Sequence, residues 1–252
     1  MATGALKDGD RREGAAAFSP LYKQIKDLLL QALDQGEWRP GEAIPSELEL
    51  AARFQVSQGT VRKAVDELAA EHILIRRQGK GTFVATHQEA RVRFRFLRLV
   101  SQAGEMGNGK SEILLCKKVR ANAEMARELG LSTGDGLVFI RRLLSFSGKP
   151  TVVDDIYLPQ NQFKGMSLEL LQQNDGPLYW FFESRFGVSM LRADEKIRAV
   201  AASAEVADLL GVETGYPVLR VDRISYTYGD RAVELRYGHY VTDEYYYRNS
   251  LN

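Results

Sequence analysis

Basic side chains gather in one short stretch of the sequence, between residues 53 and 80. Six basic residues there face only three acidic ones, although the whole chain of 252 residues has a formal net charge of +1. The six are Arg53, Arg62, Lys63, Arg76, Arg77 and Lys80, against Asp66, Glu67 and Glu71. Guanidinium and ammonium groups clustered in this way bind phosphate oxygens. The stretch therefore predicts a local basic face of the kind that binds nucleic acid.

The sequence offers few residues for a disulfide, a metal site, catalysis or a membrane span. The single cysteine, Cys116, excludes an intrachain disulfide and suits a reducing cytoplasm, where we expect the protein to be located. The three histidines, His72, His87 and His239, are scattered and have no neighbouring cysteine, so we predict neither a metal site nor a cofactor. No nucleophile stands beside a base, so we predict no catalytic residue and no enzyme. No run approaches the roughly 18 apolar residues of a membrane span, so no membrane partner is expected.

Three helices are predicted around the basic stretch. Apolar residues recur at helical spacing over 21–33, and Gly36 ends the pattern. Ser46 and Glu49 have the spacing of a capping box, which marks the start of a second helix. Ser57 is placed to cap a third helix. The second and third helices are short and are separated by a tight turn, as in a helix-turn-helix.

A hairpin is predicted directly after the third helix. The runs 73–76 and 82–84 have strand character, and the glycine-rich segment 78–81 joins them as a turn. Such a hairpin beside a helix-turn-helix is a wing.

The remainder of the chain contains an internal repeat with a period of 81 residues. The first copy has Ala123, Gly130, Gly134, Val138 and Gly148, and the second has Ala204, Gly211, Gly215, Leu219 and Gly229. Each copy reads as a helix, a turn bounded by glycines and two strands around a hairpin. The pattern predicts one α+β domain of two related lobes with a central antiparallel sheet, and a small ligand would fit the crevice between the lobes.

The length favours two domains. We expect a disordered tail at 1–17, a winged helix-turn-helix domain at 18–86, a linker at 87–95 and the α+β domain at 96–252. The arginine-rich segment from about residue 86 to 98 suits a linker or an exposed strand beside DNA, and a solvated edge without DNA contact is an equal alternative.

Two runs of the N-terminal part carry a specific motif. One reads PSExxLAxxFxVSxxTVRxAxxxL from Pro45 to Leu68, and the other reads RRQGKGTFV from Arg76 to Val84. Together they closely resemble the DNA-binding domain of the GntR family of transcription regulators. The resemblance implies that the third helix enters the major groove and that the wing lies along the backbone or minor groove. The DNA contacts it implies come from Arg53, Ser57, Gln58, Thr60, Arg62, Gly79, Lys80 and Gly81.

This sequence departs from the GntR pattern at Gln58 and Leu48, where family members often have arginine. The base preference is therefore expected to differ from the common operator of the family.

A looser set of residues extends over the C-terminal part. It includes Arg142, Gly148, Pro150, the run Tyr157-Leu158-Pro159, Glu195, Ile197, Gly211, Gly215, Pro217, Glu234, Asp243 and Tyr245. The set is similar to the UTRA effector domain of the HutC subfamily, whose fold resembles chorismate lyase. The resemblance implies an effector site formed by Arg142, Asp154, Glu234 and Tyr240. Two positions differ from relatives that bind sugar phosphates: this sequence has Leu144 where many have arginine and Pro177 where serine is common. A small organic acid or an amino-acid derivative is therefore expected at least as much as a sugar phosphate.

These resemblances imply a repressor that binds a near-palindromic operator in double-stranded DNA as a homodimer, and whose affinity a small-molecule effector changes. An enzyme with a chorismate-lyase-like fold tethered to a DNA-binding domain is the first alternative, and turnover of a bound ligand would distinguish it. A nucleoid or architectural DNA binder is the second, and it would show a steep salt dependence with little sequence preference.

Overall fold

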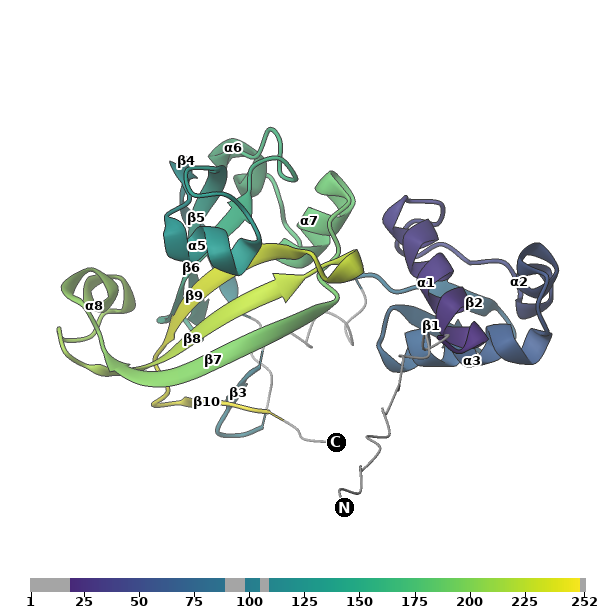
Figure 1. The fold of residues 1–252 in the computed structure, drawn as a ribbon. Helices are drawn as coiled ribbons and strands as arrows, with labels where there is room; N and C mark the ends of the chain where they lie inside the picture. The colour runs from purple at the N-terminus through teal and green to yellow at the C-terminus, as the bar shows by residue number, and fades with distance from the viewer. Residues whose placement is uncertain (1–18, 89–97, 105–108, 250–252) are drawn as a thin grey trace, which may run out of the picture.

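We describe the protein from a computed structural model, in which residues 19–88, 98–104 and 109–249 are described (Figure 1). The tail expected at 1–17 and most of the linker expected at 87–95 lie outside these residues. The first residue of that expected linker, His87, is buried. No helix in the described segments is long and apolar enough to cross a membrane.

The N-terminal part contains three helices and a hairpin. The elements are α1 (Leu21–Asp34), α2 (Glu47–Phe54), α3 (Gln58–Ala70), β1 (Leu74–Arg77) and β2 (Gly81–Val84). Ser46 and Glu49 form the predicted capping box of α2, and the side chain of Ser57 accepts a hydrogen bond from Thr60 N at the start of α3. Strands β1 and β2 pair antiparallel as the wing. The predicted winged helix-turn-helix fold is therefore confirmed.

The C-terminal part is built on a six-stranded antiparallel sheet in the order β4-β5-β6-β9-β8-β7. Its strands are β4 (Lys110–Arg120), β5 (Gly136–Phe146), β6 (Lys149–Pro159), β7 (Arg192–Ala201), β8 (Pro217–Tyr226) and β9 (Ala232–Tyr240). A separate two-stranded sheet pairs β3 (Leu99–Ser101) with β10 (Tyr245–Tyr247).

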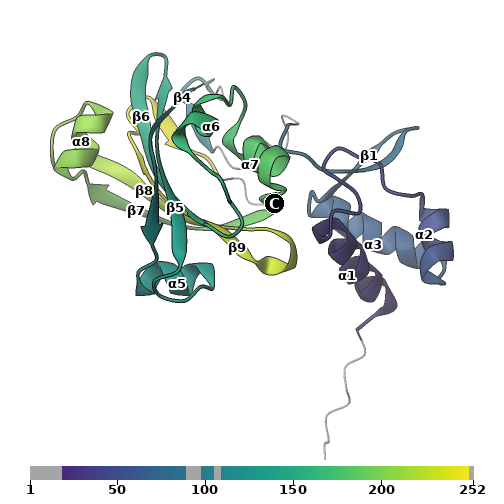
Figure 2. The ribbon, with the colours of Figure 1, turned by 90° about the horizontal axis from the view of Figure 1, so that it is seen from above.

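Helices cover both faces of the large sheet (Figures 1 and 2). They are α5 (Ala123–Leu129), α6 (Leu168–Gln172), α7 (Leu178–Phe186) and α8 (Ala204–Leu210), with a 3-10 turn η1 (Tyr228–Asp230) between β8 and β9. Ile140 and Ile156 pack with α6 and α7 on one face, while Val153 packs with α8 on the other. Neighbouring strand residues point to opposite faces, which explains why Val153 and Ile156 belong to different clusters.

The 81-residue repeat is visible in the sheet order. The first copy supplies β4, α5, β5 and β6, the second supplies β7, α8, β8 and β9, and the copies meet where β6 pairs with β9. The two related halves thus share one continuous sheet. The repeat places Arg223 on β8 at the position that Arg142 has on β5.

The two parts of the chain touch at the end of the sheet nearest α1. Tyr228 of η1 is 8% exposed and belongs to the same apolar cluster as Ile25, Leu29 and Leu33 of α1. Beside it, the guanidinium of Arg231 donates to the carboxylate of Asp34, with Nη2 2.7 Å from Oδ1. At α1, the winged helix is therefore docked against the C-terminal part mainly through an apolar contact.

Candidate functional site

The first turn of α3 presents polar side chains to solvent. Ser57 and Gln58 are exposed, and Thr60 is half-buried with its hydroxyl 2.9 Å from that of Ser57. The opposite side of α3 is fixed in the core by a set of fully buried residues, Val61, Ala64, Val65 and Leu68. The helix therefore holds its polar first turn rigidly outward, as contact with a nucleic acid requires.

Arg62 lies on the exposed side of α3, where an acidic residue of α2 holds it. Its Nε donates to Glu47 Oε2 at 2.9 Å, and Arg76 Nη2 of the wing donates to Glu47 Oε1 at 2.8 Å. Arg76 also pairs with Asp66 at 2.8 Å. Burial would raise the pKa of Glu47, but the two arginines outweigh it and lower that pKa. Glu47 thus links α2, α3 and the wing and keeps two guanidinium groups near the recognition turn.

Arg53 is engaged differently. Its Nη2 donates to Glu37 Oε2 at 2.9 Å, and its guanidinium lies over the rings of Trp38 and Phe54, 5.6 and 5.3 Å from their centroids. The predicted DNA contact Arg53 is thus held within its own domain by an ion pair and by two aromatic rings.

The wing tip has the backbone that its sequence predicts. Gly79 and Gly81 adopt positive φ values of 70° and 106°, which side chains rarely allow, and nothing lies within 4 Å of a Cβ added at either position. Lys80 between them is exposed. The tip can therefore approach a phosphate backbone closely with one cation at its apex.

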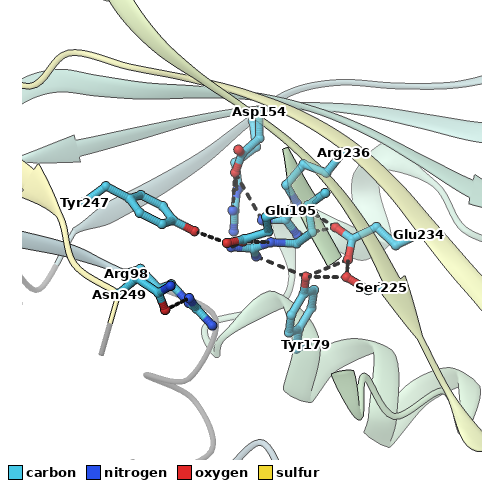
Figure 3. A network of polar contacts seen from close by, with 11 residues as sticks. Arg98, Asp154, Tyr179, Glu195, Ser225, Glu234, Arg236, Tyr247 and Asn249 are labelled. Carbon is cyan, nitrogen blue, oxygen red and sulfur yellow. Dashed lines mark hydrogen bonds and ion pairs between the residues drawn. The ribbon is translucent and has the colours of Figure 1, made fainter. Parts of the chain in front are cut away.

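The strand registers place the four predicted effector residues on one face of the sheet, and Figure 3 shows two of them, Asp154 and Glu234. Arg142 donates to Asp154 through Nε and Nη2, and Asp154 is 1% exposed. Glu234 is fully buried, and Tyr240 lies on β9 two residues beyond Gly238, the residue opposite Asp154. The four residues come from β5, β6 and β9, so they span the seam between the two repeat copies.

Sequence reasoning missed several members of the same network (Figure 3). They are Tyr179 on α7, Glu195 on β7, Arg223 and Ser225 on β8, Arg236 on β9 and Tyr247 on β10. Arg236 bridges Glu234, with Nε 2.6 Å from Oε1, and Asp154, with Nη1 3.3 Å from Oδ2. Arg223 Nε donates to Glu195 Oε1 at 2.7 Å. Arg223 lies 81 positions after Arg142, so the repeat period could have pointed to Arg223 as a member of the site.

Charges in this buried network balance. Three arginines, Arg142, Arg223 and Arg236, each pair with one or more of three carboxylates, Asp154, Glu195 and Glu234. Burial would raise the pKa of Asp154, but Arg142 and Arg236 lower it, so this carboxylate is ionised. Burial raises the pKa of both Tyr179 and Tyr240, so both phenols are neutral donors. The site can therefore offer donors and acceptors together.

One acceptor of the network is left over. Asp154 Oδ1 is buried and has no hydrogen-bond partner among the residues that the structure describes. A Cβ added at Gly238 would lie 2.9 Å from this oxygen and 3.0 Å from the hydroxyl of Tyr240. In the same described part, no three His, Cys, Asp or Glu residues are grouped so that they could hold a metal ion.

Comparisons with known proteins cover both parts of the chain. Residues 21–84 match the family described as bacterial regulatory proteins, gntR family, and residues 106–246 match the UTRA domain. The chain is 31% identical over 236 residues to an HTH-type transcriptional regulator of Mycobacterium tuberculosis, covering 92% of this chain and 86% of that protein. It is 27% identical over 207 residues to the histidine utilization repressor of Pseudomonas putida, covering 81% of this chain and 82% of that protein.

A solved structure is similar to the C-terminal part. It is the ligand-binding domain of a transcriptional regulator assigned to the GntR family, from Bordetella bronchiseptica, with 59% sequence identity and a TM-score of 0.61. The match covers 63% of this chain and 98% of that chain.

Proposed function

This chain belongs to the gntR family of bacterial regulatory proteins and carries a UTRA domain, and on that premise we propose how it regulates transcription. It acts in the cytoplasm as a homodimeric repressor whose two winged helices read a near-palindromic operator. A small molecule bound in the buried network of the UTRA domain changes the affinity for DNA. The proposal is carried by the first turn of α3, which is exposed and polar on one side and anchored by buried residues on the other.

In the DNA complex, Gln58 and Arg62 read base edges, while Ser57 and Thr60 bind phosphate. Arg62 exchanges its partner on Glu47 for DNA, and Arg76 remains to neutralise that carboxylate. Lys80 at the wing tip binds the backbone between the glycines that allow its approach. One such module buries limited surface, so specificity needs two modules, which is the reason for proposing a dimer and a near-palindrome.

Binding to the DNA upstream of its own gene tests the proposal. Arg62→Ala should weaken specific binding by about 1 to 3 kcal/mol at fixed salt. Arg198→Ala is the matched control, because Arg198 is an exposed arginine that also holds one carboxylate, Asp222, but lies on β7 of the other domain. Equal binding of the wild type to upstream and random DNA would contradict the proposal, and equal effects of the two substitutions would remove Arg62 from the interface.

For the effector, the balanced charges favour an amino-acid derivative over a sugar phosphate. A phosphate group would add about 1.5 to 2 negative charges to a site whose arginines are already neutralised by carboxylates. An amino-acid derivative brings one carboxylate for an arginine such as Arg142 and one N–H donor for Asp154 Oδ1. The donor also removes the cost of a buried acceptor without a partner.

A thermal-shift screen separates the two classes. Free and N-acetylated amino acids should raise the melting temperature and change operator affinity, while glucosamine 6-phosphate and glucose 6-phosphate should not. Asp154→Asn should abolish the shift caused by the amino-acid class. A shift caused only by the sugar phosphates would contradict this choice of effector.

No observation favours the enzyme alternative, since the relatives of the chain are transcription regulators. Most polar groups of the buried network are engaged in ion pairs and hydrogen bonds with one another, and the carboxylate of Glu234, which accepts from Ser225, is itself paired with Arg236. We therefore propose that the protein binds its effector without converting it. Recovery of a chemically unchanged amino-acid probe after prolonged incubation is the expected result.

A further inference from the structure

Helix α7 carries two polar residues on its otherwise apolar buried side. Tyr179 and Glu183 lie four residues apart, so they stand one above the other on the same side of the helix. Both are buried, at 8% and 7% exposure. In both ribbon views α7 lies at the side of the C-terminal part that faces the winged helix (Figures 1 and 2).

The Tyr179 end of this pair belongs to the buried network. The hydroxyl of Tyr179 donates to Glu234 Oε2 at 2.6 Å, and Ser225 Oγ donates to the same oxygen at 2.8 Å (Figure 3). The guanidinium carbon of Arg236 lies 5.2 Å from the centroid of the Tyr179 ring. A ligand that changes the position of Glu234 or Arg236 therefore acts directly on Tyr179.

The Glu183 end holds the chain where it leaves the wing. Thr86 Oγ1 donates to Glu183 Oε1, and the backbone N of His87 donates to Glu183 Oε2 at 3.2 Å. Only Ala85 separates these two residues from the end of β2, so Glu183 fixes the end of the wing strand to the C-terminal part. We call Thr86 and His87 the junction.

A second contact joins the two ends. The ring of His87 packs edge-on against that of Tyr179, with centroids 5.5 Å apart and an interplanar angle of 66°. His87 Nε2 accepts a hydrogen bond from Met190 N at 3.2 Å, in the segment that follows α7. Glu183 thus holds the junction by hydrogen bonds. The His87 ring of the junction also contacts Tyr179, whose hydroxyl donates to Glu234.

We propose that Tyr179 and Glu183 are the positioning residues through which the effector site controls the junction. This inference rests on the proposed function and deepens it by naming the element that connects ligand to wing. A ligand displaces Tyr179, α7 shifts as a rigid unit, and Glu183 releases or reorients Thr86 and His87. The orientation of the wing relative to the UTRA domain then changes. A ligand can act in this way only if it binds the two arrangements with different affinity.

Hydrogen exchange of the full-length protein tests the connection without a ligand. Tyr179→Phe removes the hydroxyl that binds Glu234 but keeps the ring that packs on His87. It should raise the exchange rate of the peptide over residues 85–88 by about tenfold, the effect expected from weakening one buried charge-assisted hydrogen bond. Tyr247→Phe is the matched control, because Tyr247 also donates its hydroxyl to a carboxylate of the network, Glu195, but lies on β10.

A second variant separates coupling from general loosening. Thr86→Val removes the hydroxyl that Glu183 holds and should itself speed exchange at the junction. In that background Tyr179→Phe should add less than it does alone, because the two changes act on one connection. Exchange in α2, which is distant from the junction, should stay at the wild-type rate in all variants.

The expected result is faster exchange at the junction with Tyr179→Phe, unchanged exchange with Tyr247→Phe, and a non-additive double variant. Unchanged exchange with Tyr179→Phe would overturn the proposal, and so would an equal increase with Tyr247→Phe or strict additivity. Failure of the wild type to prefer its upstream DNA would instead contradict the proposed function. The exchange measurement is independent of DNA, so the two failures are distinguishable.

Discussion

Docking of the winged helix on the UTRA domain should depend on one aromatic side chain. Tyr228 reaches from η1 into the apolar cluster of α1, whereas the neighbouring ion pair of Arg231 with Asp34 is exposed to solvent, at 56% and 32% for the two side chains. Burial of one large apolar side chain stabilises by about 2 to 3 kcal/mol. An exposed ion pair contributes about 0 to 1 kcal/mol. The apolar contact therefore outweighs the charged one.

We expect Tyr228→Ala to lower the ratio of docked to undocked molecules by roughly 30- to 140-fold, since each 1.4 kcal/mol is a factor of ten. Arg231→Ala should lower it by about fivefold or less. Tyr228→Phe keeps the ring and removes the hydroxyl, so it should stay close to the wild type.

Single-molecule energy transfer between dyes on α3 and α8 measures this ratio directly. Because we propose that the protein is a homodimer, a small fraction of labelled chains is mixed with excess unlabelled protein, which keeps the signal within one chain. The reasoning is refuted if Tyr228→Ala changes the populations by less than twofold, or if Arg231→Ala undocks the domain as strongly. Either result would mean that the contact with α1 is not what holds the winged helix.

Two further predictions concern the wing and the junction. Lys80→Ala should weaken binding to specific and random DNA alike and lower the slope of log affinity against log salt by about one, measured by titration at several salt concentrations; a loss confined to the specific site would contradict a phosphate contact. Burial raises the pKa of Glu183, so the stability that its protonated form provides is present at low pH and is lost as pH rises through that raised pKa. The melting temperature of the wild type relative to Glu183→Gln should therefore fall as pH rises from about 4 to 7; His87 and Tyr228 are common to both proteins, and a constant difference would contradict the burial argument.

Much of the fold can be predicted from the sequence because helix caps and glycine turns depend on residues close together in the chain. The capping box of Ser46 and Glu49 and the glycines of the wing act over three or four residues, and each appears where the sequence predicts it. The 81-residue repeat predicts the sheet because each copy must form the same helix and strands.

Long-range pairs were not predictable in this way. Glu47 holds Arg62 and Arg76, which are 15 and 29 residues away, and no spacing rule connects them. The contact of Tyr228 with α1 joins residues about 200 positions apart. Of the candidate site, the resemblance supplied four residues, while Tyr179 lay hidden in the apolar run of α7, where a buried tyrosine reads as core.

The energetic cost of the buried network argues for a ligand. On β6, Asp154 stands between Val152 and Ile156, each part of an apolar cluster on the same face of the sheet. Apolar side chains could therefore continue across the seam, and replacing a buried ion pair by packed apolar residues is often neutral or stabilising by about 1 to 4 kcal/mol. The network instead holds several desolvated charges and, among the described residues, one acceptor, Asp154 Oδ1, without a hydrogen-bond partner. It lies where the two repeat copies meet, and Tyr179 connects it to α7. A group bound at this proposed site would touch both halves of the sheet and Tyr179 at once, as a sensor of effector binding requires.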